Sequence, residues 1–187
     1  MERGAVPLWN IANILTLVRL ALVPVFAVLL LHADGRESWW RLAAAAVFMI
    51  ASFTDRLDGQ LARERGLITD FGKIADPIAD KALIGAALVG LSLLGELGWW
   101  VTIVIAAREI GVTLLRFWVI RYGVIPASRG GKAKTMAQIA AIVAFLLPLP
   151  PGAAVVRWVL MGAALVLTVV TGADYVVRAL RLRAGAR

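Results

Sequence analysis

Long apolar runs recur along the chain and are separated by short polar breaks. Each run holds about 18–22 residues, which is enough to cross a bilayer as an α-helix. Breaks such as His-Ala-Asp-Gly at 32–35 and Gly-Glu-Leu-Gly at 95–98 have the composition of loops. The pattern predicts an all-α integral membrane protein with six transmembrane helices, forming a single membrane domain over residues 1–187. The expected spans are Asn13–Leu31, Leu42–Ala62, Ile74–Leu94, Trp99–Ile120, Thr135–Leu149 and Val155–Val177.

The two ends of the chain differ from these runs. We expect residues 1–12 to lie at the membrane surface, with a short interfacial helix near residues 5–12 that contains Pro7, Leu8 and Trp9. Residues 179–187 are rich in arginine and are expected to form a basic tail. Tryptophans lie near predicted span ends, as in interfacial belts; they are Trp39, Trp40, Trp99, Trp100 and Trp158.

Composition agrees with the membrane interpretation and excludes several classes of protein. The chain is 61% hydrophobic, which excludes an ordinary soluble domain. It has no cysteine, so it has no disulfide framework and no thiolate metal site, and its one histidine offers no metal cluster. The net charge is +8, but the positive residues fall in breaks and tails. Anionic membrane lipid therefore explains the charge better than nucleic acid does.

The distribution of Lys and Arg predicts the orientation. With six spans, twelve basic residues face one side and three face the other. Because basic loops stay inside, the richer side is expected to be cytosolic, together with both termini. An arginine- and alanine-rich composition favours a bacterial source, and hence the plasma membrane. The cytosolic group is Arg3, Arg63, Arg65, Lys73, Arg121, Arg129, Lys132, Lys134, Arg178, Arg181, Arg183 and Arg187, and the opposite group is Arg36, Arg41 and Arg157.

Four aspartates lie near the cytosolic ends of the second and third predicted spans. Asp55 and Asp58 are three residues apart, and Asp76 and Asp80 are four apart. Each spacing places two carboxylates on one helix face. Four carboxylates cannot stay ionised together without compensation. Hard oxygen ligands suit Mg²⁺, Mn²⁺ or Ca²⁺, so we expect divalent cations here, most simply two ions that share the cluster.

The same stretch fits a known pattern. The string Asp55-x2-Asp58-Gly59-x2-Ala62-Arg63-x8-Gly72-x3-Asp76-x3-Asp80 resembles the signature of the CDP-alcohol phosphotransferases, with all eight fixed positions present. Members of that family move a phosphoalcohol from a CDP-linked donor to an acceptor hydroxyl and release CMP. The resemblance implies two Mg²⁺ or Mn²⁺ ions, one held by Asp55, Asp58 and Asp76 and the other by Asp55, Asp76 and Asp80. It also implies that Asp80 is the general base and that the protein is a homodimer.

Other positions are expected to bind the donor. Gly59 and Gly72 leave room for a ligand close to the backbone, and Arg63 can hold a phosphate oxygen. Ala62 fits a tight helix crossing, and Thr69 matches a hydroxyl position that contacts the donor in the family. Near the N-terminus, Asn13-Ile-Leu-Thr16-Leu-Val-Arg19 resembles the opening of phosphatidylglycerophosphate synthases, which adds Asn13 and Thr16 to the expected CDP-diacylglycerol site.

Further segments bear on the acceptor. Arg108-Glu109-Ile-Gly-Val-Thr-Leu-Leu-Arg116 and Gly131-Lys132-Ala-Lys134-Thr135 resemble the same synthases. Arg108 and Arg116 are two turns apart on one helix face. Together with Lys132 and Lys134 they make four cations, which the single carboxylate of Glu109 cannot neutralise. Glycerol 3-phosphate would supply the missing negative charge, so we expect Arg108, Arg116, Lys132 and Lys134 to bind its phosphate. Arg108 has an alternative, structural role as the partner of Glu109.

These interpretations leave alternatives. Another acceptor of the same chemistry, such as inositol phosphate, serine or phosphatidylglycerol, remains open. A cation or proton transporter could also place carboxylates at a helix hairpin, but it would not need Gly59, Arg63 and Gly72 at these spacings. A membrane scaffold without catalytic activity would not need the aspartates.

Overall fold

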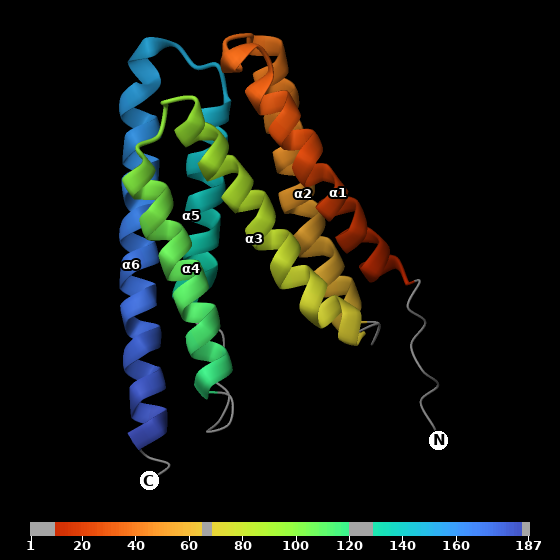
Figure 1. The fold of residues 1–187 in the computed structure, drawn as a ribbon, viewed down its shortest axis with the longest axis vertical. Helices are drawn as coiled ribbons and strands as arrows, with labels where there is room; N and C mark the ends of the chain where they lie inside the picture. Colours follow the sequence, from red (N-terminus) through yellow and green to blue (C-terminus); the bar gives the residue numbers. More distant parts are fainter. Residues whose placement is uncertain (1–9, 65–68, 120–128, 185–187) are drawn as a thin grey trace. The chain divides into compact units, whose positions relative to one another are not determined.

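The chain forms six α-helices in the residues that the structure describes, which are 10–64, 69–119 and 129–184 of this computed structural model. No strand occurs in these ranges, which confirms the all-α prediction. The helices are α1 (Ile11–Leu31), α2 (Ser38–Glu64), α3 (Asp70–Leu93), α4 (Trp99–Val119), α5 (Arg129–Leu146) and α6 (Ala154–Ala184), shown in Figure 1. The predicted interfacial helix falls largely on residues 1–9, which lie outside the described residues.

Each helix overlaps a predicted span, but the ends differ from the prediction. α2 and α3 begin at Ser38 and Asp70 rather than at Leu42 and Ile74, and α5 ends at Leu146 rather than Leu149. The largest differences are at the start of α5 and the end of α6. α5 begins at Arg129 rather than Thr135, and α6 continues to Ala184, into the predicted basic tail. The apolar run ends where charges appear, whereas lysine and arginine are good helix formers and let the helix continue. Arg181 and Arg183 lie in the last turn of α6, where positive charge is favourable next to the helix dipole.

Two segments of the described chain are long and apolar enough to cross a membrane by length and composition. They are Asn13–Gly35, which covers most of α1, and Ala154–Ala184, which is α6. On α6, the exposed valines Val159, Val166 and Val170 recur at spacings that place them on one face. An apolar face of this kind suits contact with lipid. By contrast, α4 carries charges within its length. Six transmembrane spans stay a prediction.

The helices group into two compact units, which are described separately. The first contains α1, α2 and α3, through Leu94, together with residues 146–148. Phe26 and Phe48 lie in its core with ring centroids 5.6 Å apart. α1 and α3 approach closely at Gly90, where a Cβ atom would stand 2.6 Å from Cδ2 of Leu30. Glycine at this position therefore lets the two helices meet.

The turn between α1 and α2 is closed by a buried arginine. Gly35 has φ +66°, in the region that favours glycine. Arg41, near the start of α2, donates from Nε to the carbonyl of Leu146 at 3.2 Å and from a terminal nitrogen to the carbonyl of Gly35 at 3.3 Å. Because Arg41 is buried, these bonds replace the water that its guanidinium would otherwise need.

The second unit contains α4, α5 and α6. α4 packs along α6, and Phe145 of α5 lies edge-on to Trp158 of α6 with centroids 5.4 Å apart. Gly172 of α6 faces Arg108 of α4, because a Cβ atom there would stand 3.0 Å from Cγ of that arginine. A glycine in α6 thus makes room for a charged side chain between two helices. The single domain predicted from the sequence stays a prediction.

Candidate functional site

Asp76 and Asp80 lie one turn apart on α3, and both are half-buried. This confirms that the Asp-x3-Asp spacing falls on a helix, as the sequence predicts. Thr16 of α1 donates a hydrogen bond from its hydroxyl to Oδ1 of Asp76. Within the described residues, no hydrogen bond to Oδ2 of the same carboxylate is present.

The first turn of α3 is built from two more of the predicted donor residues. Thr69 is the N-cap, and its hydroxyl oxygen accepts a hydrogen bond from the backbone N–H of Gly72 at 3.0 Å. The same hydroxyl donates to Oδ1 of Asn13 at 2.8 Å. A Cβ atom on Gly72 would stand 3.0 Å from Oδ1 of Asn13 and 3.3 Å from Oγ1 of Thr69. A side chain at 72 would therefore crowd the contact between Asn13 of α1 and Thr69 at the start of α3.

α1 is itself fixed at this end. Asn10 is its N-cap and accepts a hydrogen bond from the backbone N–H of Asn13 at 3.0 Å. Asn13, Thr16 and Thr69 are all buried. The structure thus brings together five residues that the sequence assigned to the donor and metal sites. They are Asn13, Thr16, Thr69, Gly72 and Asp76.

The other half of the predicted metal and donor site lies in the last turns of α2. Asp55, Asp58, Gly59, Ala62 and Arg63 belong to the helical segment that ends at Glu64, but their side chains lie outside the described part of the structure. α2 packs against α3, and α1 and α3 begin at the end of the unit where α2 ends (Figure 1). The last turns of α2 and the first turns of α3 therefore lie at one end of the unit, and the convergence of the two aspartate pairs there stays a prediction.

The described side chains are suitable for a divalent cation. Asp76 and Asp80 offer hard carboxylate oxygens one turn apart on α3, and such oxygens are what Mg²⁺ and Mn²⁺ bind. Three or more ligating side chains do not converge among the residues whose side chains are described. Because Asp55 and Asp58 are outside that set, the complete four-aspartate cluster stays a prediction.

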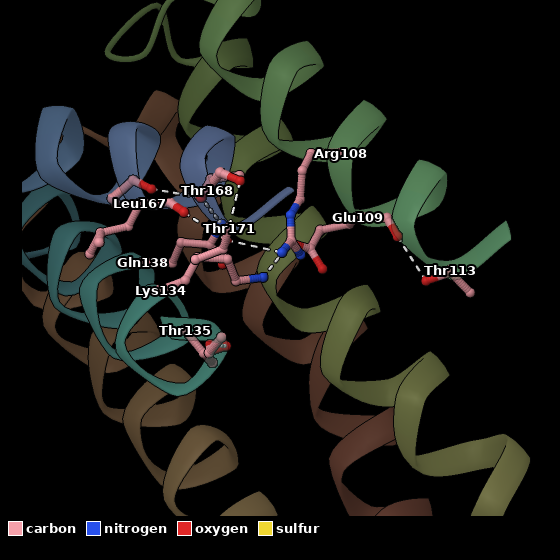
Figure 2. A network of polar contacts seen from close by, with 11 residues as sticks. Arg108, Glu109, Thr113, Lys134, Thr135, Gln138, Leu167, Thr168 and Thr171 are labelled. Atoms are coloured by element: carbon pink, nitrogen blue, oxygen red, sulfur yellow. Dashed lines mark hydrogen bonds and ion pairs between the residues drawn. The ribbon is translucent and has the colours of Figure 1, made fainter. Parts of the chain in front are cut away.

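A polar network crosses the second unit (Figure 2). Oε1 of Glu109 accepts a hydrogen bond from Arg108 at 3.0 Å and forms an ion pair with Lys134 of α5. Arg108 also donates to Oγ1 of Thr171 on α6 at 3.0 Å. The side chains of Arg108 and Lys134 are only 15% and 7% exposed. Because little water reaches them, the carboxylate of Glu109 compensates their positive charge.

The network continues from α5 to α6. Gln138, one turn after Lys134, donates from Nε2 to Oγ1 of Thr168 at 3.0 Å. Thr168 in turn donates to the carbonyl of Ala164 at 2.6 Å. Three helices are thereby joined by hydrogen bonds, and because Gln138 and Thr168 are buried, the bond between them need not compete with water.

The structure brings together only some of the four predicted acceptor residues. Arg108 and Lys134 meet at Glu109. Arg116 and Lys132 are exposed and are not part of this network in the described residues. The guanidinium carbon of Arg116 lies 5.9 Å from the ring centroid of Tyr175, a cation–π distance. The alternative role of Arg108, as a partner of Glu109, is therefore present in the structure.

Sequence reasoning missed three members of the network and undervalued a fourth. Gln138, Thr168 and Thr171 were not predicted, and Glu109 was treated as a counter-ion for one cation rather than two. The spacing of Lys134 and Gln138, one turn apart, was a signal for Gln138. The threonines gave little signal, because hydroxyls in apolar helices usually bond to the carbonyl of the preceding turn, as Thr171 does with Leu167 at 2.6 Å.

Comparison with known proteins shows sequence similarity over most of the chain. The family model described as CDP-alcohol phosphatidyltransferase matches residues 9–170. The chain is 56% identical over 184 residues to a protein named "Probable phosphatidylglycerophosphate synthase" in Mycobacterium tuberculosis, covering 98% of this chain and 88% of that protein. It is 40% identical over 185 residues to the CDP-diacylglycerol–glycerol-3-phosphate 3-phosphatidyltransferase of Bacillus subtilis, covering 90% and 94%. A protein of the same name from Escherichia coli K12 is 41% identical over 140 residues, covering 72% and 75%.

Proposed function

The chain belongs to the CDP-alcohol phosphatidyltransferase family, and we propose that it transfers the phosphatidyl group of CDP-diacylglycerol to sn-glycerol 3-phosphate. The products are phosphatidylglycerophosphate and CMP. The names of relatives that align with 72–98% of the chain support this choice of donor and acceptor. The observation that supports it most directly is the α1–α3 junction, where Asn13, Thr16 and Thr69 surround the motif residues Gly72 and Asp76.

The metal site consists of the four motif aspartates, Asp55, Asp58, Asp76 and Asp80. Two divalent ions, Mg²⁺ or Mn²⁺, would supply positive charge against the donor pyrophosphate and the leaving oxygen of CMP. Asp55 and Asp76 are assigned to both ions. Asp58 is assigned to one ion and Asp80 to the other.

The reaction is a single displacement at phosphorus. The hydroxyl oxygen of glycerol 3-phosphate attacks the phosphate next to diacylglycerol, and Asp80 accepts the hydroxyl proton. A new bond forms between that oxygen and phosphorus while the bond from phosphorus to the CMP oxygen breaks. CMP leaves with the electron pair of the broken bond. The donor is assigned to Asn13, Gly59, Ala62, Arg63, Thr69 and Gly72, and Thr16 lies at the same junction beside Asp76.

The acceptor phosphate is assigned to Arg108, Arg116, Lys132 and Lys134. Arg108, Lys134 and Glu109 together carry one net positive charge inside the second unit. A phosphate dianion would complement this charge, and it would do so more strongly once Arg116 and Lys132 contribute. An uncharged acceptor such as a simple alcohol would gain nothing from four cations, which favours a phosphorylated acceptor.

The enzyme is proposed to be a homodimer in the bacterial plasma membrane, with both termini and the site facing the cytoplasm. Basic residues on the predicted cytoplasmic side support this orientation. Single cysteines can test it in this cysteine-free chain. Glu37 and Arg181 are exposed and described, so a cysteine at Glu37 should react with an impermeant maleimide outside intact cells, and one at Arg181 should not.

An acceptor panel tests the proposed function. Purified protein with CDP-diacylglycerol and Mg²⁺ should release CMP when glycerol 3-phosphate is added. Inositol phosphate, serine and phosphatidylglycerol should give much less CMP under the same conditions. Turnover with one of those acceptors alone would keep the family chemistry and reject the assigned acceptor. Absence of CMP release with every acceptor, with cation flux in vesicles, would favour a transporter instead.

A further inference from the structure

Thr16 joins α1 to an aspartate that lies 60 residues later in the chain. Its hydroxyl donates to Oδ1 of Asp76, and the residue is only 2% exposed. A threonine in a helix usually donates to the carbonyl of its own preceding turn, as Thr113 does with the carbonyl of Glu109 at 2.7 Å. The hydroxyl of Thr16 donates to a carboxylate on a neighbouring helix.

This hydrogen bond distinguishes the two oxygens of Asp76. Oδ1 is engaged by Thr16, while Oδ2 lies on the side of Gly72, where a Cβ atom would stand 3.8 Å away. Gly72 has no side chain to cover Oδ2. The carboxylate is therefore held with one oxygen bonded to protein and the other facing the bare backbone of the motif glycine.

A second contact fixes α1 against α3 one turn earlier. Asn13 precedes Thr16 by three residues, so both lie on the same face of α1. Asn13 accepts a hydrogen bond from Thr69, the N-cap of α3. The two contacts hold the register of α1 against the first turns of α3, and a shift of either helix would break both of them.

We infer that Thr16 is a positioning residue that orients the Asp76 carboxylate for metal binding, rather than a residue that contacts the lipid donor. The inference rests on the proposed function, which places a metal at Asp76. Hydrogen bonds to the ligands of a metal set their orientation, and their loss typically lowers metal affinity about 10–100-fold. A valine at position 16 keeps the shape of threonine but cannot donate to Oδ1.

The test measures Mn²⁺ binding to the purified full-length protein without substrate. The electron paramagnetic resonance signal of free Mn²⁺ reports how much of the ion is bound. Thr16→Val should raise the Mn²⁺ Kd about 10–100-fold, whereas Thr16→Ser, which keeps the hydroxyl, should bind nearly as tightly as the wild type. Thr113→Val is the matched control, since its hydroxyl bonds within its own helix, and its Kd should not change. At saturating Mn²⁺, the KM of Thr16→Val for CDP-diacylglycerol should stay close to that of the wild type.

Three results would overturn the inference in different ways. Unchanged Mn²⁺ affinity in Thr16→Val, with a raised donor KM, would make Thr16 a donor-binding residue and leave the metal site standing. Equal loss of affinity in Thr16→Val and Thr16→Ser would show a packing effect. Absence of Mn²⁺ binding in the wild type would reject the proposed metal site together with this role for Thr16. If Thr16→Val aggregates, Thr16→Ala carries the same expectation and removes the same hydroxyl.

Discussion

Glu109 of α4 and Lys134 of α5 form an ion pair across 25 residues of sequence, and Arg108 shares the same carboxylate oxygen. Two of the four cations that the sequence assigns to the acceptor phosphate, Arg108 and Lys134, thus meet on one acidic side chain. Removal of that side chain would leave two positive charges close together among apolar helices. Glu109 is therefore expected to matter for stability as well as for the acceptor site.

Glu109→Ala should lower the stability of the purified protein by about 1–3 kcal/mol, because two charged donors lose their partner. The control is Asp174→Ala, which removes an exposed ion pair with Arg178 at 2.9 Å. Surface pairs contribute about 0–1 kcal/mol, so the control should melt nearly as the wild type does. Thermal unfolding in detergent measures both variants. Equal melting of Glu109→Ala and the wild type would show that the network does not support the second unit.

The aspartates differ in the number of ions assigned to them. Asp55→Asn and Asp76→Asn each remove a ligand of both ions and should abolish CMP release. Asp58→Asn removes a ligand of one ion and should recover part of its activity at raised Mn²⁺. Activity at a series of Mn²⁺ concentrations separates these cases. Wild-type turnover that survives EDTA would contradict the two-metal assignment.

Asp80→Asn should separate binding from chemistry. The amide cannot accept the acceptor proton, so turnover should fall about 10²–10⁴-fold. Affinity for CDP-diacylglycerol should stay within about tenfold, or about 1.4 kcal/mol. Measurements of steady-state CMP release and of donor binding together separate the two effects. Turnover within a few-fold of the wild type would remove Asp80 from the role of base, although it could still ligate metal.

Arg116→Ala and Lys134→Ala should raise the KM for glycerol 3-phosphate about 10–150-fold, the equivalent of one charge-assisted hydrogen bond of about 1.5–3 kcal/mol. The KM for the donor should change little, because other residues hold the donor. Arg116→Lys should recover only part of the loss, since lysine keeps the charge but lacks the planar fork. If both alanine variants keep the wild-type acceptor KM, Arg116 serves orientation in the membrane instead, and Lys134 serves the ion pair with Glu109.

Much of the fold could be predicted from the sequence, because apolar runs of sufficient length have few alternatives to helix. The errors lie at helix ends and are largest at the start of α5 and the end of α6, where helix continues through Lys132 and Lys134 and through Arg181 and Arg183. Hydropathy measures partition into lipid and falls at a charge, whereas helix formation depends on backbone preference, which lysine and arginine satisfy. A span predicted from hydropathy therefore stops short of its helix where the helix runs into charged sequence.

The residues of the α1–α3 junction could be predicted, but their contacts could not. Asn13, Thr16, Thr69 and Gly72 all stand at motif positions, yet nothing in the sequence indicates that Thr16 bonds to Asp76 or that Asn13 bonds to Thr69. Such pairs depend on the register of two helices that are in contact in the fold but have a third helix between them in the sequence. The same reason explains Gln138 and Thr168, which become partners only when α5 and α6 are placed side by side.

The proposed reaction moves a phosphatidyl group from CDP-diacylglycerol to glycerol 3-phosphate. The most direct test supplies radiolabelled glycerol 3-phosphate and unlabelled CDP-diacylglycerol to the purified protein with Mg²⁺, and follows label in the lipid extract. We expect labelled phosphatidylglycerophosphate in equal amount to the CMP released, and none with Asp76→Asn. CMP release without label in the lipid, or label in the lipid without CDP-diacylglycerol, would contradict it.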